Sequence, residues 1–147
     1  MASIHNDIPL PAPAQDVWDA VRDFGGLDRR LVPGFVTACT RDGDARIVTF
    51  ANGSMAREVL VDCDDARRRL VYGINNERLT HYSASVQVIA EGETRCRLVW
   101  TIDMLPNGLA PYVQGQTKEA VAAMHRAFPT PTILATSIAS PPSREQA

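Results

Sequence analysis

Three side chains near the middle of the sequence combine acid–base and hydrogen-bonding chemistry with apolar surroundings: Glu58, Tyr72 and Tyr82. In the segment AREVL, the period-two alternation of a strand places Glu58 on the same face as Ala56 and Leu60. A carboxylate on such a face is anomalous, because burying it unpaired costs several kcal/mol or raises its pKa until it is neutral. Glu58 is therefore the first candidate for a functional acid.

Two interpretations of this acid remain open. In the functional one, Glu58 orients a ligand hydroxyl or acts as a general base, with Tyr82 or Tyr72 as its hydrogen-bond partner. In the structural one, Glu58 forms an ion pair at a cavity mouth with an arginine such as Arg78, or is exposed at a strand end. For both tyrosines, the structural alternative is a core aromatic ring whose hydroxyl reaches water.

Metal and phosphate chemistry find little support in the sequence. His5, His81 and His125 lie on separate elements and lack the close spacing that metal ligands usually show. No glycine-rich loop opens a helix with a lysine, which is the usual signature of phosphate binding. We therefore expect no metal and no cofactor.

The composition indicates one globular domain, since the 147 residues are 45% hydrophobic. With 15 Lys and Arg against 17 Asp and Glu, the net charge of -2 gives no electrostatic reason to expect nucleic acid as a partner. No apolar run approaches the roughly 18 residues of a membrane span, and no signal segment is visible, so membrane insertion is not expected. The three cysteines lack CxxC spacing, which favours a reducing, cytoplasmic location.

The elements that position these residues follow from periodicity and turn signals. A strand is predicted at 2–10, and Pro13 can open a helix that Gly25 and Gly26 end. A short second helix is predicted over LDRRL, ended by Pro33 and Gly34. Six antiparallel strands then follow at 35–41, 45–50, 54–62, 69–74, 81–90 and 95–104, and a long helix at 108–128. Residues 129–147 contain four prolines and are predicted to form an irregular tail after a single domain at 1–128.

Alternation along the strands also groups the side chains by face. Val36 and Ala38 are expected on the inner face, with Cys39 on the outer face and no base beside it, so a thiol nucleophile is not favoured. The other shared faces are Leu70, Tyr72 and Ile74; Tyr82, Ala84, Val86 and Val88; and Leu98, Trp100, Ile102 and Met104. On the long helix, one stripe holds Val113, Thr117, Ala120, Val121 and Met124.

The order of elements resembles the START-like helix-grip (SRPBCC) superfamily, especially bacterial polyketide cyclase/dehydrase and lipid-transport-like proteins. The resemblance covers residues 2–128 and rests on PAPAQDVWDAVRDFGGLDR, REVLVDCDDARRRLVYGI, and RLTHYSASVQV followed by LVWTIDMLP. It implies an α+β helix-grip fold, in which a curved antiparallel sheet of about seven strands wraps around a long C-terminal helix, with two short helices after the first strand. It also implies an internal cavity for a small apolar molecule.

Plant hormone receptors of the same superfamily are similar around NERLTHYSAS. That similarity implies that Glu58, Leu70, Tyr72, Tyr82 and Ala84 face the cavity and that Arg78 and Leu79 belong to an entrance loop. The receptors' pocket lysine, which anchors a ligand carboxylate, falls near Pro33 here, so a carboxylate-bearing ligand is not expected. The full set of candidate ligand-binding residues is Val36, Ala38, Ala56, Glu58, Leu60, Leu70, Tyr72, Arg78, Leu79, Tyr82, Ala84, Val86, Leu98, Trp100, Val113, Thr117, Ala120, Val121 and Met124.

Three functions follow as hypotheses. The first is a binding or carrier protein for an apolar or aromatic molecule, whose polar end Glu58 and Tyr82 fix. The second is a cyclase or dehydratase that uses Glu58 and a tyrosine as acid and base. Similar cyclases typically carry an inward arginine, whereas Arg57 is expected to point outward. The third is an antitoxin-like module that binds a protein partner, and the sequence leaves open whether the chain forms a homodimer.

Overall fold

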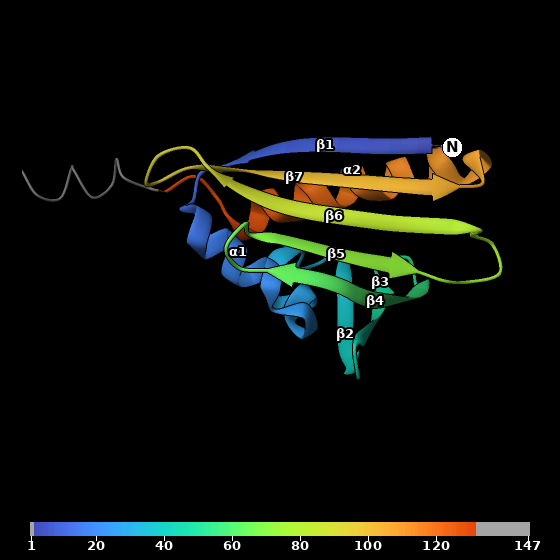
Figure 1. The fold of residues 1–147 in the computed structure, drawn as a ribbon. Helices are drawn as coiled ribbons and strands as arrows, with labels where there is room; N and C mark the ends of the chain where they lie inside the picture. Colours follow the sequence, from blue (N-terminus) through green and yellow to red (C-terminus); the bar gives the residue numbers. More distant parts are fainter. Residues whose placement is uncertain (1, 132–147) are drawn as a thin grey trace, which may run out of the picture.

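Seven strands form one antiparallel sheet in the order β1-β7-β6-β5-β4-β3-β2 (Figure 1). The computed structural model describes residues 2–131. Its strands are β1 (Ala2–Leu10), β2 (Val36–Asp42), β3 (Ala45–Phe50), β4 (Met55–Asp64), β5 (Arg69–Ile74), β6 (His81–Ala90) and β7 (Cys96–Leu105). Strands β2 to β7 pair in sequence order as a meander, and β1 adds to β7 at the far edge. The predicted antiparallel sheet of seven strands is confirmed.

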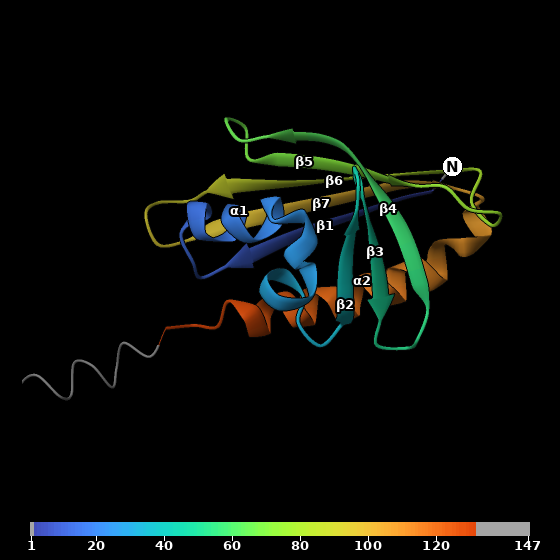
Figure 2. The same cartoon turned by 90° about the horizontal axis from the view of Figure 1, so that it is seen from below.

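Two groups of helices complete the fold. Between β1 and β2 lie α1 (Ala14–Arg22), a 3-10 turn η1 (Phe24–Gly26) and a short helical segment η2 (Leu27–Leu31). After β7 come the 3-10 turn η3 (Asn107–Leu109) and the long helix α2 (Ala110–Ala127). Figures 1 and 2 show α2 lying along one side of the curved sheet, which is the predicted helix-grip arrangement.

The strand boundaries agree with the sequence prediction to within two residues. The reason is local, because turn residues separate the strands. Gly43, between β2 and β3, and Gly92, between β6 and β7, have φ angles of +61° and +91°, which residues with a side chain rarely adopt. The predicted tail at 129–147 lies outside the described residues from position 132 onward.

The core lies between the sheet and the helices. Alternate residues of β7 are buried, and they are Cys96, Leu98, Trp100, Ile102 and Met104. From the other side, α2 contributes the buried Thr117, Ala120, Ala123 and Met124. Most of these helix residues are small, so the helix axis can approach the sheet closely along part of its length.

Two bulges change the alternation of side chains. One lies in β2 between Val36 and Ala38, and the other lies in β4 between Leu60 and Asp62. A bulge inserts one extra residue and shifts every later side chain to the other face. The prediction for β2 beyond Val36 was therefore wrong: Ala38 is exposed, and Cys39 turns inward and packs against the core.

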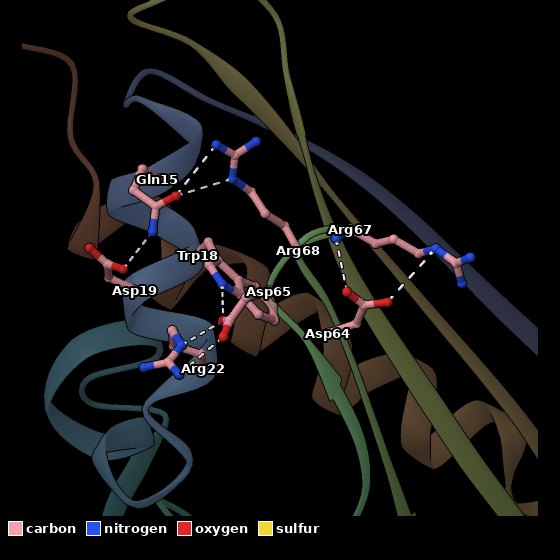
Figure 3. Close-up of polar contacts among 8 residues, drawn as sticks. All are labelled: Gln15, Trp18, Asp19, Arg22, Asp64, Asp65, Arg67 and Arg68. Atoms are coloured by element: carbon pink, nitrogen blue, oxygen red, sulfur yellow. Dashed lines mark hydrogen bonds and ion pairs between the residues drawn. The ribbon is translucent and has the colours of Figure 1, made fainter.

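Helix α1 is attached to the turn between β4 and β5 by a small polar cluster (Figure 3). Asp65 of this turn accepts hydrogen bonds from Trp18 Nε1 at 2.9 Å and from Arg22 Nε at 2.8 Å. The Trp18 side chain is otherwise buried, so its only polar atom finds a partner at the surface. These contacts fix the position of α1 against the sheet.

Candidate functional site

A cavity of about 240 Å³ lies between the concave face of the sheet and α2. It is partly open to solvent, and most of its lining is apolar. For comparison, an apolar cavity of about 150 Å³ is large enough to hold benzene. The cavity is therefore large enough for a molecule of more than one ring.

Thirteen of the nineteen candidate residues line this cavity: Val36, Ala56, Glu58, Tyr72, Arg78, Leu79, Tyr82, Val86, Trp100, Val113, Thr117, Ala120 and Met124. The other six do not. Leu70, Ala84 and Leu98 are on the inner face but are fully packed in the core. Leu60 and Val121 are partly buried against the core, and Ala38 points outward after the bulge.

Half of the lining residues were not among the candidates: Leu27, Leu31, Val32, Phe35, Phe50, Ser54, Met55, Ile74, Asn76, Ile102, Leu109, Tyr112 and Gln116. Phe50, Ile74 and Ile102 continue the alternation of their strands, and that pattern could have found them. The residues from 27 to 35 lie in short helical turns and a loop, where no periodicity marks the inner side.

Glu58 is buried, but it is not unpaired. Arg46, directly opposite on β3, donates from Nε to Glu58 Oε1 at 2.8 Å, and its Nη2 lies 2.7 Å from the same oxygen. Both residues are only 5% exposed. Glu58 is therefore an ion-pair partner, as the structural interpretation expected, but its partner is Arg46 and not Arg78, which is exposed in the loop between β5 and β6.

Arg46 is held by more than the carboxylate. Its Nη1 donates to the backbone oxygen of Phe24 at 3.2 Å, and its guanidinium carbon lies 4.0 Å from the centre of the Phe24 ring. The centre of the Tyr72 ring lies 5.2 Å from the same carbon. Such contacts compensate a guanidinium for lost water, because the aromatic faces attract cations.

The chain thus has an inward arginine, on β3 and not on β4. Arg46 alternates with Val48 and Phe50, so the signal was present in the sequence. Arg57 points outward as expected and pairs with Asp42 at 3.2 Å. Arg46 itself is not among the lining residues, whereas its partner Glu58 is.

Tyr72, Tyr82 and Trp100 form the polar part of the cavity wall contributed by β5, β6 and β7. The two tyrosine rings are tilted, with their centres 6.4 Å apart. Burial, followed by the charge of Glu58, raises the pKa of Tyr72 far above its ordinary value. Burial also raises the pKa of Tyr82. Both hydroxyls therefore remain protonated and act as hydrogen-bond donors.

The cavity lining includes residues from the loop between β5 and β6, the turn between β3 and β4, and the start of α2. Asn76 Oδ1 accepts from the backbone N–H groups of Arg78 and Leu79 at 2.8 and 3.0 Å, which shapes the loop predicted as the entrance. On the opposite side, Asn52 Nδ2 donates to the Tyr112 hydroxyl at 3.2 Å. This contact ties the β3–β4 turn to α2.

Metal and membrane features can be assessed for the described part of the chain. Within residues 2–131, no three His, Cys, Asp or Glu side chains gather in a way that could hold a metal ion. Over the same residues, every helix is too short or too polar to cross a membrane.

Comparison with known proteins places this fold among relatives. A family model described as polyketide cyclase / dehydrase and lipid transport matches residues 1–128. No curated protein matches the sequence. An uncharacterized protein from Bacillus thuringiensis is 20% identical with a TM-score of 0.76, and the alignment covers 86% of this chain and 98% of that chain.

Two further solved structures with a similar fold belong to proteins with a named activity or superfamily. The di-domain ARO/CYC BexL from the BE-7585A biosynthetic pathway is 15% identical with a TM-score of 0.72, over 86% of this chain and 46% of that chain. A START superfamily protein from Mycobacterium smegmatis is 12% identical with a TM-score of 0.63, over 82% of this chain and 91% of that chain. At these identities the similarity shows the fold alone. Because the family model spans every described element, this chain belongs to the polyketide cyclase/dehydrase and lipid transport family, and it shares the helix-grip fold of its START-like structural neighbours.

Proposed function

We propose that this protein binds a small, mainly apolar or aromatic molecule in the cavity between the sheet and α2. The observation that carries the proposal is the cavity itself: about 240 Å³, largely apolar, with a few polar groups at defined places. Ligand sites of this kind gain affinity from apolar enclosure and orientation from the polar groups. Membership of a family that includes lipid transport proteins supports the same proposal.

The polar groups favour binding over proton transfer. A general base needs an available lone pair and a pKa near the working pH. Glu58 Oε1 contacts two nitrogens of Arg46. The raised pKa values of Tyr72 and Tyr82 keep both hydroxyls protonated. We therefore place the binding or carrier function ahead of the cyclase function.

The cyclase or dehydratase function stays as a second candidate, supported by one feature. Both contacts from Arg46 end on Oε1, and Oε2 takes part in neither of them. Oε2 is the atom that would accept a proton if Glu58 served as a base.

The three cysteines are all free thiols, which supports the proposed cytoplasmic location.

The experiment is thermal unfolding against fatty acids, flavonoid-like aromatics, isoprenoids and aromatic polyketides. A ligand at 100 times its Kd stabilises the folded state by about 2.7 kcal/mol, which raises Tm by several degrees. Val86→Phe places a larger side chain in the cavity wall and should remove the shift. Ile89→Phe enlarges a partly exposed residue of the same strand outside the cavity, so it should keep the shift.

A shift for one chemical class that Val86→Phe removes and Ile89→Phe retains would establish the cavity as the binding site. A shift that survives in Val86→Phe would place binding elsewhere and contradict the proposal. Turnover of an aromatic polyketide surrogate that Glu58→Gln abolishes while the variant remains folded would favour the cyclase function. If no class of ligand raises Tm, the hypothesis of a protein partner is favoured instead.

A further inference from the structure

Trp100 carries a buried donor without a hydrogen-bond partner. The residue lines the cavity and is 9% exposed, and among the described residues Nε1 makes no hydrogen bond of good geometry, although the Tyr72 hydroxyl lies close by. An indole nitrogen can only donate. A buried donor left unpaired costs free energy, so such a group in a folded protein calls for an explanation.

The neighbours of this indole are two more donors. The Tyr72 hydroxyl lies near enough to both the Trp100 indole and the Tyr82 hydroxyl for each to influence its pKa. Together the three side chains hold three polar protons and only two oxygens. If the indole proton is directed to one phenol and the two phenols bond to each other, one phenol proton still lacks an acceptor.

The charged groups near the two tyrosines determine which kind of acceptor can take a hydrogen bond from that phenol. Arg46, the buried cation closest to Tyr72, is already paired with Glu58. Burial is the main cause of the raised pKa of both tyrosines, and the negative charge of Glu58 adds to it; a charge of that sign opposes a second anion beside them. An uncharged oxygen can accept a hydrogen bond from this phenol without facing this repulsion.

We propose that Trp100, Tyr72 and Tyr82 form a donor cluster that binds an uncharged acceptor oxygen, such as a ketone carbonyl, on an otherwise apolar ligand. This inference rests on the proposed function and names the ligand chemistry of the same cavity. The carbonyl oxygen accepts a hydrogen bond from the phenol left without an acceptor, and the apolar remainder of the ligand contacts the aliphatic wall.

The test uses three ligands of one shape and the wild-type protein: tetralin, 1-tetralone and tetrahydronaphthalene-1-carboxylate. Calorimetry should give a Kd for 1-tetralone about tenfold below that for tetralin, since one hydrogen bond to a buried donor is worth about that factor. The carboxylate should bind more weakly than 1-tetralone. In Trp100→Phe and Tyr72→Phe, the preference for the ketone should fall to about threefold or less.

The two tryptophans provide an internal control. Trp18 Nε1 already donates to Asp65 far from the cavity wall, so Trp18→Phe should keep the ketone preference. In a ¹H–¹⁵N spectrum of the wild type, the indole signal of Trp100 should move on addition of 1-tetralone, while that of Trp18 should stay. This readout needs no variant and therefore does not depend on Trp100→Phe folding.

Equal affinity for 1-tetralone and tetralin, or tightest binding of the carboxylate, would overturn the donor cluster and leave the cavity as a binding site. A Trp100 signal that does not move while the ketone binds would also overturn it. If none of the three probes binds, the proposed function fails for molecules of this size, and the inference fails with it.

Discussion

Arg46 and Glu58 lie directly opposite each other on β3 and β4, both buried, with Nε and Oε1 2.8 Å apart. Because both charged groups are buried away from water, the charge of each is stabilised mainly by the other. Removing one partner leaves an uncompensated buried charge, whereas replacing both can be neutral or even stabilising. The pair therefore contributes more to the geometry of the cavity wall than to stability.

Glu58→Gln should lower the free energy of unfolding by about 3–5 kcal/mol, because Arg46 is then buried without its counter-charge. Urea denaturation at neutral pH measures this loss. The double variant Arg46→Met with Glu58→Leu should be more stable than Glu58→Gln alone.

Asp42→Asn serves as the matched control for this prediction. It removes the exposed pair with Arg57, and we expect a loss of less than about 1 kcal/mol. If Glu58→Gln cost no more than Asp42→Asn, the buried pair would not hold in solution.

Ala84→Trp should damage the core and not simply fill the cavity. Ala84 is 1% exposed, pairs across the sheet with Tyr72 and Ile102, and does not line the cavity. Overpacking of this kind costs about 1–3 kcal/mol or more. Chemical denaturation should show this loss, and a variant as stable as the wild type would mean that Ala84 borders free space.

The raised pKa values of the two tyrosines predict a loss of stability at alkaline pH. Tyr72 and Tyr82 have pKa values raised above 10.0, so the unfolded chain releases these protons at a lower pH than the folded chain does. The stabilisation is complete below pH 10 and is lost as the pH rises through the folded pKa. Tm should therefore fall above pH 10, and Tyr72→Phe with Tyr82→Phe should flatten that fall. An equally steep fall in the double variant would show that other groups cause it.

The lowered pKa of Asp65 predicts a loss of stability at acidic pH. The hydrogen bond from Arg22, followed by that from Trp18, lowers the pKa of Asp65 below its ordinary 3.8. A lowered pKa stabilises the fold above the unfolded value, and this contribution disappears as the pH falls through the folded value.

Asp65→Asn should therefore lower Tm at pH 7, and the difference from the wild type should shrink below pH 3.8. Asp64→Asn, in the same turn, is the control, because Asp64 contacts Arg67 and not α1. A difference for Asp65→Asn that stays constant from pH 7 to pH 2 would contradict the role of its charge.

Much of the fold could be predicted from local sequence. Alternation of apolar residues in HYSASVQVIA and CRLVWTIDML sets both the strands and their inner faces, because successive side chains point to opposite sides. The same rule placed Glu58 and Tyr72 inside. It failed for Ala38, because the bulge after Val36 depends on how β2 pairs with β3.

The sequence by itself therefore determined the order of the elements, the strand faces and the presence of an inward carboxylate. Only the tertiary structure decided that Arg46 neutralises Glu58, because the partner is set by cross-strand register and by Phe24 from a distant turn. It also decided which inward residues border the cavity and which, like Leu70 and Leu98, are packed. That distinction depends on the local gap between α2 and the sheet, and no one-dimensional pattern records a gap between elements far apart in the chain.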